Sequence, residues 1–252
     1  MGVRRIWVVG VVGGVVLGLG GCGGAGVEGA PVERKAFAFR GETLVVDSDD
    51  SELVLVPADV KDVEVTRQVD GWAVLGDGPA PVWKLEGGRL TLRVECDAVV
   101  SDCEARHEVR VPRGVAVTVE GDNGDVTAEG FDTALKVTSD NGTVTVRDAG
   151  GPLELRSDNG DVRVEGATSK SVVARAGNGE IRLALGAVPD RVEAVNDNGD
   201  IAVELPGGDT RYAVEAGSAN GEVEVGVPAD DRSGHVVEAR SDNGQVTVRS
   251  AN

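Results

Sequence analysis

The dipeptide Asn-Gly occurs seven times between residues 123 and 244, and this repeat constrains the fold more than any other feature. Successive copies are separated by 18, 18, 19, 20, 22 and 23 residues. A period of this length is typical of proteins in which one structural unit stacks on the next. The recurring pairs are Asn123 and Gly124, Asn141 and Gly142, Asn159 and Gly160, Asn178 and Gly179, Asn198 and Gly199, Asn220 and Gly221, and Asn243 and Gly244.

Apolar and polar residues alternate on both sides of each Asn-Gly pair. Around Asn159, the apolar positions are Leu153, Leu155, Val162 and Val164. The same four positions hold only Val, Ile, Leu or Ala in all seven repeats, whereas the positions between them are mostly charged or Thr. Alternation with a period of two predicts two short strands per repeat, each with one buried face and one solvated face.

Two architectures fit this alternation. In an antiparallel β-hairpin meander, each Asn-Gly is a type I′ turn, and Asp158 then faces Asp161 across the hairpin, which is unfavourable. In a β-solenoid, each Asn-Gly is a corner, and stacked Asn side chains can hydrogen-bond from coil to coil. Gly at a corner also accepts a positive φ. We therefore predict an all-β, right-handed β-solenoid (β-helix) with coils of about 18–23 residues, and the meander is the alternative.

Composition restricts the partners and the interior. The chain has 43 acidic and 25 basic residues, for a formal charge of −18, so the phosphates of nucleic acids would repel it. Aromatic residues make up only 3% of the chain, which suits a narrow interior of Val and Ala and disfavours a ring-lined pocket. We expect no nucleic-acid partner and no cofactor.

The N-terminal residues resemble a lipoprotein leader. Arg4 and Arg5 precede an apolar stretch that is short for a membrane-spanning helix, which needs about 20 residues. The stretch ends in Leu-Gly-Gly-Cys22, which resembles the lipobox of bacterial lipoproteins. The resemblance implies a signal peptide at residues 1–21 and a lipidated Cys22 that anchors the chain to the outer face of the cell membrane. Residues 22–35 would then be a flexible tether. An ordinary secretory signal is the alternative.

The repeats also resemble a known family. The segment Leu153–Val164 is similar to the adhesin-like β-strand-repeat family of bacterial surface lipoproteins, a domain of unknown function. A cysteine pair followed by Val111-Pro112 also looks like members of this family. The resemblance covers residues 36–252 and implies a binding or scaffolding protein of the cell envelope. It brings no catalytic motif that could be transferred.

The part before the repeats is predicted to cover the end of the solenoid. We divide the remaining chain into an N-terminal β cap at residues 36–115 and the solenoid repeats at residues 116–252, because solenoids need atypical end units. Within the cap, Val46–Leu55 aligns with the repeat as a degenerate first coil. We expect Trp72 and Trp83 to pack within the cap, and an aromatic ligand groove is the alternative.

Two cysteines remain once Cys22 carries lipid. Cys96 and Cys103 are close in sequence and lie in a compartment that permits disulfides, so we predict that they pair. The alternative is a zinc site that adds His107, for which the sequence offers no clear fourth ligand.

Carboxylates flank the corners, as Asp158 and Asp161 do at the third repeat. Stacking would repeat them about every 4.8 Å, and Ca²⁺ favours such oxygen-rich sites. Arginines such as Arg156 and Arg163 can screen these acids, so we predict no metal site. The chain has no nucleophile elbow, His-Glu-x-x-His motif or phosphate loop. We predict a protein that is not an enzyme, and a carbohydrate-active β-solenoid enzyme using clustered Asp and Arg is the alternative.

A solvated row on the repeats hints at a binding surface. It contains Thr127, Thr145, Arg163 and Arg182. The sequence thus predicts a lipid-anchored, extracytoplasmic, adhesin-like binding or scaffolding protein. Its expected partners are the membrane through the lipid anchor, the cell wall or an envelope protein, and a second copy through the edges of the solenoid.

Overall fold

The computed structural model describes residues 27–76, 79–96 and 98–251, with the backbone alone at 73–76 and 98–102. The predicted signal peptide at residues 1–21 and the predicted lipidation site Cys22 lie outside the described residues. Within the described part, no helix is both long enough and apolar enough to cross a membrane.

The strands form two sheets, which we call sheet A and sheet B. In spatial order, sheet A contains β1 (Glu33–Phe37), β4 (Val63–Gly76), β7 (Ala98–Pro112), β3 (Glu52–Ala58), β9 (Val126–Glu129), β11 (Val144–Arg147), β13 (Val162–Ala167), β15 (Ile181–Leu185), β17 (Ile201–Leu205), β21 (Val246–Ser250) and β19 (Val223–Gly226). Sheet B contains β18 (Ala213–Asn220), β20 (Val236–Asn243), β16 (Arg191–Asn198), β14 (Ser171–Asn178), β12 (Leu153–Asn159), β10 (Leu135–Asn141), β8 (Ala116–Asn123), β2 (Thr43–Ser48), β6 (Arg89–Glu95) and β5 (Ala80–Glu86). A short 3₁₀ helix, η1 (Val27–Gly29), precedes β1.

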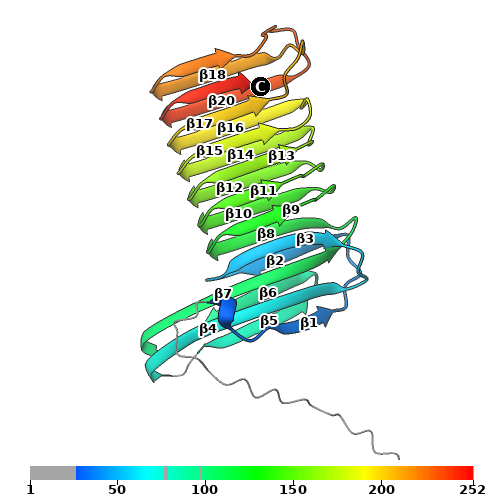
Figure 1. Cartoon of the computed structure of the whole chain (residues 1–252), viewed down its shortest axis with the longest axis vertical. Helices are drawn as coiled ribbons and strands as arrows, with labels where there is room; N and C mark the ends of the chain where they lie inside the picture. Colours follow the sequence, from blue (N-terminus) through cyan, green and yellow to red (C-terminus); the bar gives the residue numbers. More distant parts are fainter. Residues whose placement is uncertain (1–26, 77–78, 97, 252) are drawn as a thin grey trace, which may run out of the picture.

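Each Asn-Gly pair connects a strand of sheet B to a strand of sheet A, and one such pair of strands is a coil. Coils stack along the long axis of the molecule (Figure 1). Neighbouring repeat strands are parallel and in register, as β10 and β12 are, with Leu135 beside Leu153 and Val137 beside Leu155. The predicted β-solenoid is therefore confirmed, and the hairpin meander is wrong for the repeats.

The core lies between the two sheets. Leu153 and Leu155 of β12 and Val162 and Val164 of β13 are at most 2% exposed, and the same positions are buried in the neighbouring coils. Because a strand turns alternate side chains to opposite faces, the charged residues between them face solvent. The aromatic poverty of the chain fits this interior, in which Val, Leu, Ile and Ala meet face to face.

The Asn side chains form a ladder along the corners. Asn159 Nδ2 donates to Asn141 Oδ1 at 3.0 Å, and Asn178 Nδ2 donates to Asn159 Oδ1 at 2.9 Å. All seven corner amides donate in the same direction, and the row ends where Asn123 Nδ2 donates to Asp50 Oδ1 at 2.6 Å. Such a ladder explains why the corner recurs almost unchanged.

Each corner Asn is followed by Gly mainly because the neighbouring coil leaves no room for a side chain, and less because of the backbone conformation. A Cβ atom on Gly160 would lie 2.2 Å from the carbonyl oxygen of Gly142 in the neighbouring coil, and the other corners are similarly close. Positive φ occurs at only part of the corners, for example at Gly124 and Gly199. Positive φ, the expected reason for Gly at the corners, is therefore only part of the explanation, because the contact between coils requires Gly even at corners without a positive φ.

One coil departs from the sequence order. The C-terminal coil, β20 and β21, lies between the coil of β16 and β17 and the coil of β18 and β19. Simple stacking in chain order is thus wrong at this end. The two longest repeat spacings, 22 and 23 residues, flank Asn220 and supply the extra chain needed to step over one level and return.

The cap combines parallel and antiparallel strands. β2 and β3 lie parallel to β8 and β9 as a coil without Asn-Gly, whereas β4 pairs with β7, and β5 with β6, in antiparallel fashion. Trp83 packs against the core, and the Arg67 guanidinium lies 3.8 Å from its ring centroid. Trp72 is 53% exposed, so the expectation that it packs within the cap is wrong. It lies in the long antiparallel pair of β4 and β7, opposite Asp102.

Candidate functional site

The acids that follow the corners are engaged with the backbone of the next coil. Oδ1 of Asp125, Asp161 and Asp200 accepts a hydrogen bond from the backbone N–H of Thr143, Glu180 and Gln245, respectively, each at 2.8 Å. Neutral Thr143 and Gln245 interrupt the column of acids. In the described part of the chain, no group of three or more His, Cys, Asp or Glu side chains is placed to hold a metal ion. These carboxylates therefore act as structural links between coils.

A second set of links was missed by the sequence reasoning. The residue two positions before the corner Asn is Gly in the first repeat and Ser, Ala or Asn in the other six. Buried beside the corner are Ser139, Ser157, Ala176, Asn196 and Ser241. Ser157 Oγ donates to the carbonyl oxygen of Gly142 at 2.8 Å, and Asn196 Nδ2 donates to that of Gly179 at 2.7 Å. The signal was present, because small or polar residues recur at that spacing.

The cysteine pair forms a disulfide. Cys96, just after β6, is bonded to Cys103 in β7, as predicted. His107 is fully buried, and its Nδ1 lies 3.1 Å from Ser51 Oγ. Burial, and next the nearby Arg67 charge, lower the pKa of His107 to about 4, so the imidazole is neutral at pH 7. Oxidation of both thiols excludes the zinc alternative.

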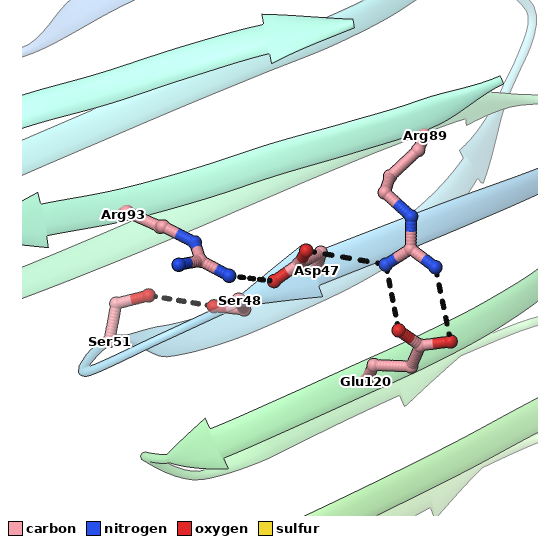
Figure 2. Close-up of polar contacts among 6 residues, drawn as sticks. All are labelled: Asp47, Ser48, Ser51, Arg89, Arg93 and Glu120. Carbon is pink, nitrogen blue, oxygen red and sulfur yellow. Dashed lines mark hydrogen bonds and ion pairs between the residues drawn. The ribbon is translucent and has the colours of Figure 1, made fainter. Parts of the chain in front are cut away.

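A polar cluster joins the cap to the first regular coil on the outer face of sheet B. Figure 2 shows Arg89 of β6 between Asp47 of β2 and Glu120 of β8, with Arg93 on the other side of Asp47. Arg89 Nη1 lies 2.7 Å from Glu120 Oε2 and 3.2 Å from Asp47 Oδ2. Two arginines thus face two carboxylates. The cluster is balanced in charge and links three strands, which fits a structural clamp.

The acidic end of the ladder lies close to this cluster. Burial, and next the charges of Asp50 and Asp122, raise the pKa of Asp49 above its ordinary value. Asp50 itself accepts the last amide of the ladder. The three acids therefore belong to the junction between the ladder and the cap.

The predicted polar row is assembled on the outer face of sheet A, but it is not solvated throughout, because Thr145 is only 8% exposed. Thr127, Thr145, Arg163 and Arg182 occupy matching positions of β9, β11, β13 and β15. The row continues into a shallow depression of about 440 Å³ that small side chains leave open. The side chains lining the depression include Arg163, Glu165, Arg182, Ala184, Ala202, Glu204 and Arg249.

The charges around this depression are paired. Arg249 Nη2 lies 2.9 Å from Glu204 Oε2, and Arg147 Nε lies 2.9 Å from Glu165 Oε2. A surface of alternating, exposed ion pairs can receive a polar partner along its length. A second depression, of about 590 Å³, lies further along the same face between β1, β4 and β7.

The two ends of the long axis differ. At one end, the chain enters the cap through η1, where Gln68 Nε2 donates to the carbonyl oxygens of Val27, Glu28 and Ala30. At the other end, β18 and β19 are the outermost strands of sheets B and A (Figure 1). Val223 and Val225 of β19 are each 44% exposed, although their equivalents in inner coils are buried. We call the coil of β18 and β19 the open end.

Comparisons with known proteins agree with this architecture. A model of the family described as Toastrack DUF4097 matches residues 91–251. A solved structure of a candidate adhesin from Bacteroides fragilis is similar with a TM-score of 0.57 and 15% identity, over 88% of this chain and 97% of that one. A candidate adhesin from Parabacteroides distasonis is similar with a TM-score of 0.50 and 12% identity, over 88% and 98%. At such identities the likeness concerns the fold. None of the curated proteins matches the chain.

Proposed function

The chain belongs to the Toastrack DUF4097 family, and from this premise we propose that it is a lipid-anchored, adhesin-like binding or scaffolding protein of the bacterial cell envelope. Lipid on Cys22 holds the cap end at the outer face of the cell membrane. The solenoid extends from there and offers its solvated sheet faces to the cell wall or to an envelope protein. The names of the similar structures, which describe candidate adhesins, support this role.

The observation that carries the proposal is the separation of the two ends. The C-terminal part of the predicted tether contains η1 and the start of β1, and the coils stack away from this end along the long axis (Figure 1). Only four residues separate Cys22 from Val27, so this segment, if extended, spans less than about 20 Å. A molecule held in this way presents its repeats at a distance from the membrane.

The anchor is tested by Cys22→Ala in a bacterium that lipidates its exported proteins. We expect the unchanged chain to incorporate a labelled fatty acid and to enter the detergent phase, because two acyl chains anchor a protein durably. The Cys22→Ala chain should be unlabelled and should stay in the aqueous phase. Equal partition of the two chains would rule out a lipid anchor at this residue.

The binding face is tested with two matched double variants. Glu204→Ala with Arg249→Ala removes an ion pair at the depression of sheet A, whereas Lys136→Ala with Glu154→Ala removes an exposed pair from sheet B. Retention of each protein on isolated cell envelope is then measured. We expect the sheet A variant to lose at least fivefold in retention, and the sheet B control to be unchanged. Equal retention of both would exclude the depression as the contact.

A further inference from the structure

The open end has the properties of an unprotected sheet edge. Edge strands in soluble proteins usually carry charged side chains, above all Lys, or Pro, which discourage pairing. At the cap end, the outer strands follow this rule, with Arg34 and Lys35 in β1 and Pro81 in β5. β18 and β19 have the sequences AVEAGSAN and VEVG, with no Lys, Arg or Pro and with one Glu each. The residues of β1 and β5 thus discourage strand pairing at the cap end of the solenoid, whereas the open end has less protection against it.

From the open end we infer that a second copy of this chain is the partner, and that the two copies join end to end by antiparallel pairing of β18 with β18 and of β19 with β19. This inference specifies one partner of the proposed binding function and rests on it. Two parallel edges separated by the width of a core require a partner with the same two edges, and a second open end has them.

The backbone of the open end is directed correctly for this pairing. The Ala213 N–H donates to the His235 carbonyl oxygen at 2.8 Å, and the Glu222 carbonyl oxygen accepts from Val246 N–H at 2.9 Å. Strand residues alternate in the side to which they direct N–H and C=O. Ala216 and Val225 therefore direct these groups outward, away from the neighbouring coil.

One register suits both strands. Ala216 lies four residues before Asn220, and Val225 lies four residues after Gly221, so both stand at the same distance from the corner. A single two-fold axis perpendicular to the sheets can therefore run beside both residues. Ala216 then faces Ala216 of the second copy, and Val225 faces Val225 of the second copy. In this register, Val223 of one copy lies opposite Val227 of the other, and the exposed apolar residues of β19 cover one another.

Two glycines support this register. A Cβ atom on Gly217 would meet no atom within 4 Å, and one on Gly226 would have only an ordinary contact of 3.8 Å. Neither has a positive φ in the left-handed region. Their neighbours in the adjacent coil are Arg240 and Arg249, so the fold accepts large side chains there.

The pairing explains why these two positions are Gly. With Ala216 and Val225 on the axis, Glu215 of one copy lies opposite Gly217 of the other, and Glu224 lies opposite Gly226. Moving the axis by one residue away from the corner would place Glu215 opposite Glu215, and moving it by one residue toward the corner would place Glu224 opposite Glu224, and both are unfavourable. The glycines leave room for the acids in the register that avoids this repulsion.

The first experiment measures the oligomeric state of the full chain carrying Cys22→Ala, which has no acyl group at this position, by sedimentation equilibrium. We expect a concentration-dependent dimer. Val225→Lys places two charges at the axis and should raise the dissociation constant at least tenfold. Val173→Lys makes the same change on the outer face of an inner coil and should leave it unchanged. A monomer at all concentrations, or a dimer insensitive to Val225→Lys, would overturn the inference.

A charge exchange tests the register. Gly226→Glu should raise the dissociation constant at least tenfold, because the new acid faces Glu224 of the other copy. Adding Glu224→Lys should restore the dimer, since Lys then faces Glu. Circular dichroism and melting temperature establish that each variant folds. Failure of the second change to restore a lost dimer would refute this register.

These outcomes separate the inference from the proposed function. If the unchanged chain takes up the fatty acid but the Cys22→Ala chain stays monomeric, end-to-end pairing alone is refuted. If the Cys22→Ala chain dimerises but the unchanged chain takes up no fatty acid, the anchor alone is refuted. If both hold, the open ends of molecules on two facing membranes can join.

Discussion

Gly160→Ala is the sharpest test of the view that contact between coils, more than backbone conformation, requires the recurring glycine. The φ of Gly160 is outside the left-handed region, so the backbone alone would accept Ala. The added Cβ would lie 2.2 Å from the Gly142 carbonyl oxygen, whereas real Cβ atoms stay at least 3.0 Å away. The two coils must therefore separate locally by about 0.8 Å, the difference between these distances.

The cost of this separation follows from the bonds at the corner. Ser157 Oγ lies 2.8 Å from the Gly142 oxygen, and Asn159 Nδ2 lies 3.0 Å from Asn141 Oδ1. A shift of about 0.8 Å stretches both beyond the range of a hydrogen bond, and each contributes about 1 kcal/mol. Overpacking adds about 1–3 kcal/mol. We expect Gly160→Ala to lower the free energy of unfolding by about 3–5 kcal/mol.

The assay is urea unfolding followed by circular dichroism, in the Cys22→Ala chain. Gly234→Ala is the control, because a Cβ there meets no atom within 4 Å and φ is not in the left-handed region. The control should remain within about 0.5 kcal/mol. Because stacked repeats can unfold in parts, the slope against urea is compared as well. A Gly160→Ala protein as stable as the control would refute the steric argument.

Three further predictions concern the ladder, the buried histidine and the disulfide. Asn159→Ala removes the ladder hydrogen bonds on both sides of this residue and should lower the free energy of unfolding, measured with urea, by about 2 kcal/mol. Asn220 is the end of the ladder that accepts no bond from another corner amide, so Asn220→Ala should lower it by about half as much. Because the pKa of His107 is lower in the folded protein than in the unfolded chain, the unfolded chain binds a proton at a higher pH than the folded protein does. The free energy of unfolding should therefore fall as the pH drops from about 6.5 to about 4, by about 3 kcal/mol in total. His107→Leu should flatten that part of the profile, and an unchanged profile would contradict the assignment. Replacing Cys96 and Cys103 by Ser should lower the unfolding free energy of the cap by roughly 2–3 kcal/mol, measured by melting of reduced and oxidised protein.

The repeat itself could be predicted because it is a local pattern. The alternation around each Asn reports which face of a strand is buried, and the identity of the corner reports stacking, so the solenoid followed from the sequence. The position of the last coil could not be predicted in this way. β18 and β20 carry equivalent residues, and only the longer connections around Asn220 indicate that one coil passes over the other.

The cap was harder to predict because its packing depends on contacts distant in sequence. Trp72 and Trp83 both lie in strands, but the Arg67 guanidinium lies over the Trp83 ring, whereas Trp72 is exposed in the antiparallel pair of β4 and β7. The candidate binding surfaces likewise depend on which coil is outermost. The exposure of Val223 and Val225 follows from the coil order, and their local sequence is that of any other repeat.

The unusual coil order also determines how the molecule would carry a mechanical load. In a solenoid stacked in chain order, the last coil has one covalent link to the body, and a pull on it can strip the chain away one coil at a time. Here residues 206–212 and 227–235 both join the outermost coil to the body, and β21 lies one level below that coil. Tension applied at the outermost coil is therefore shared by two peptide connections.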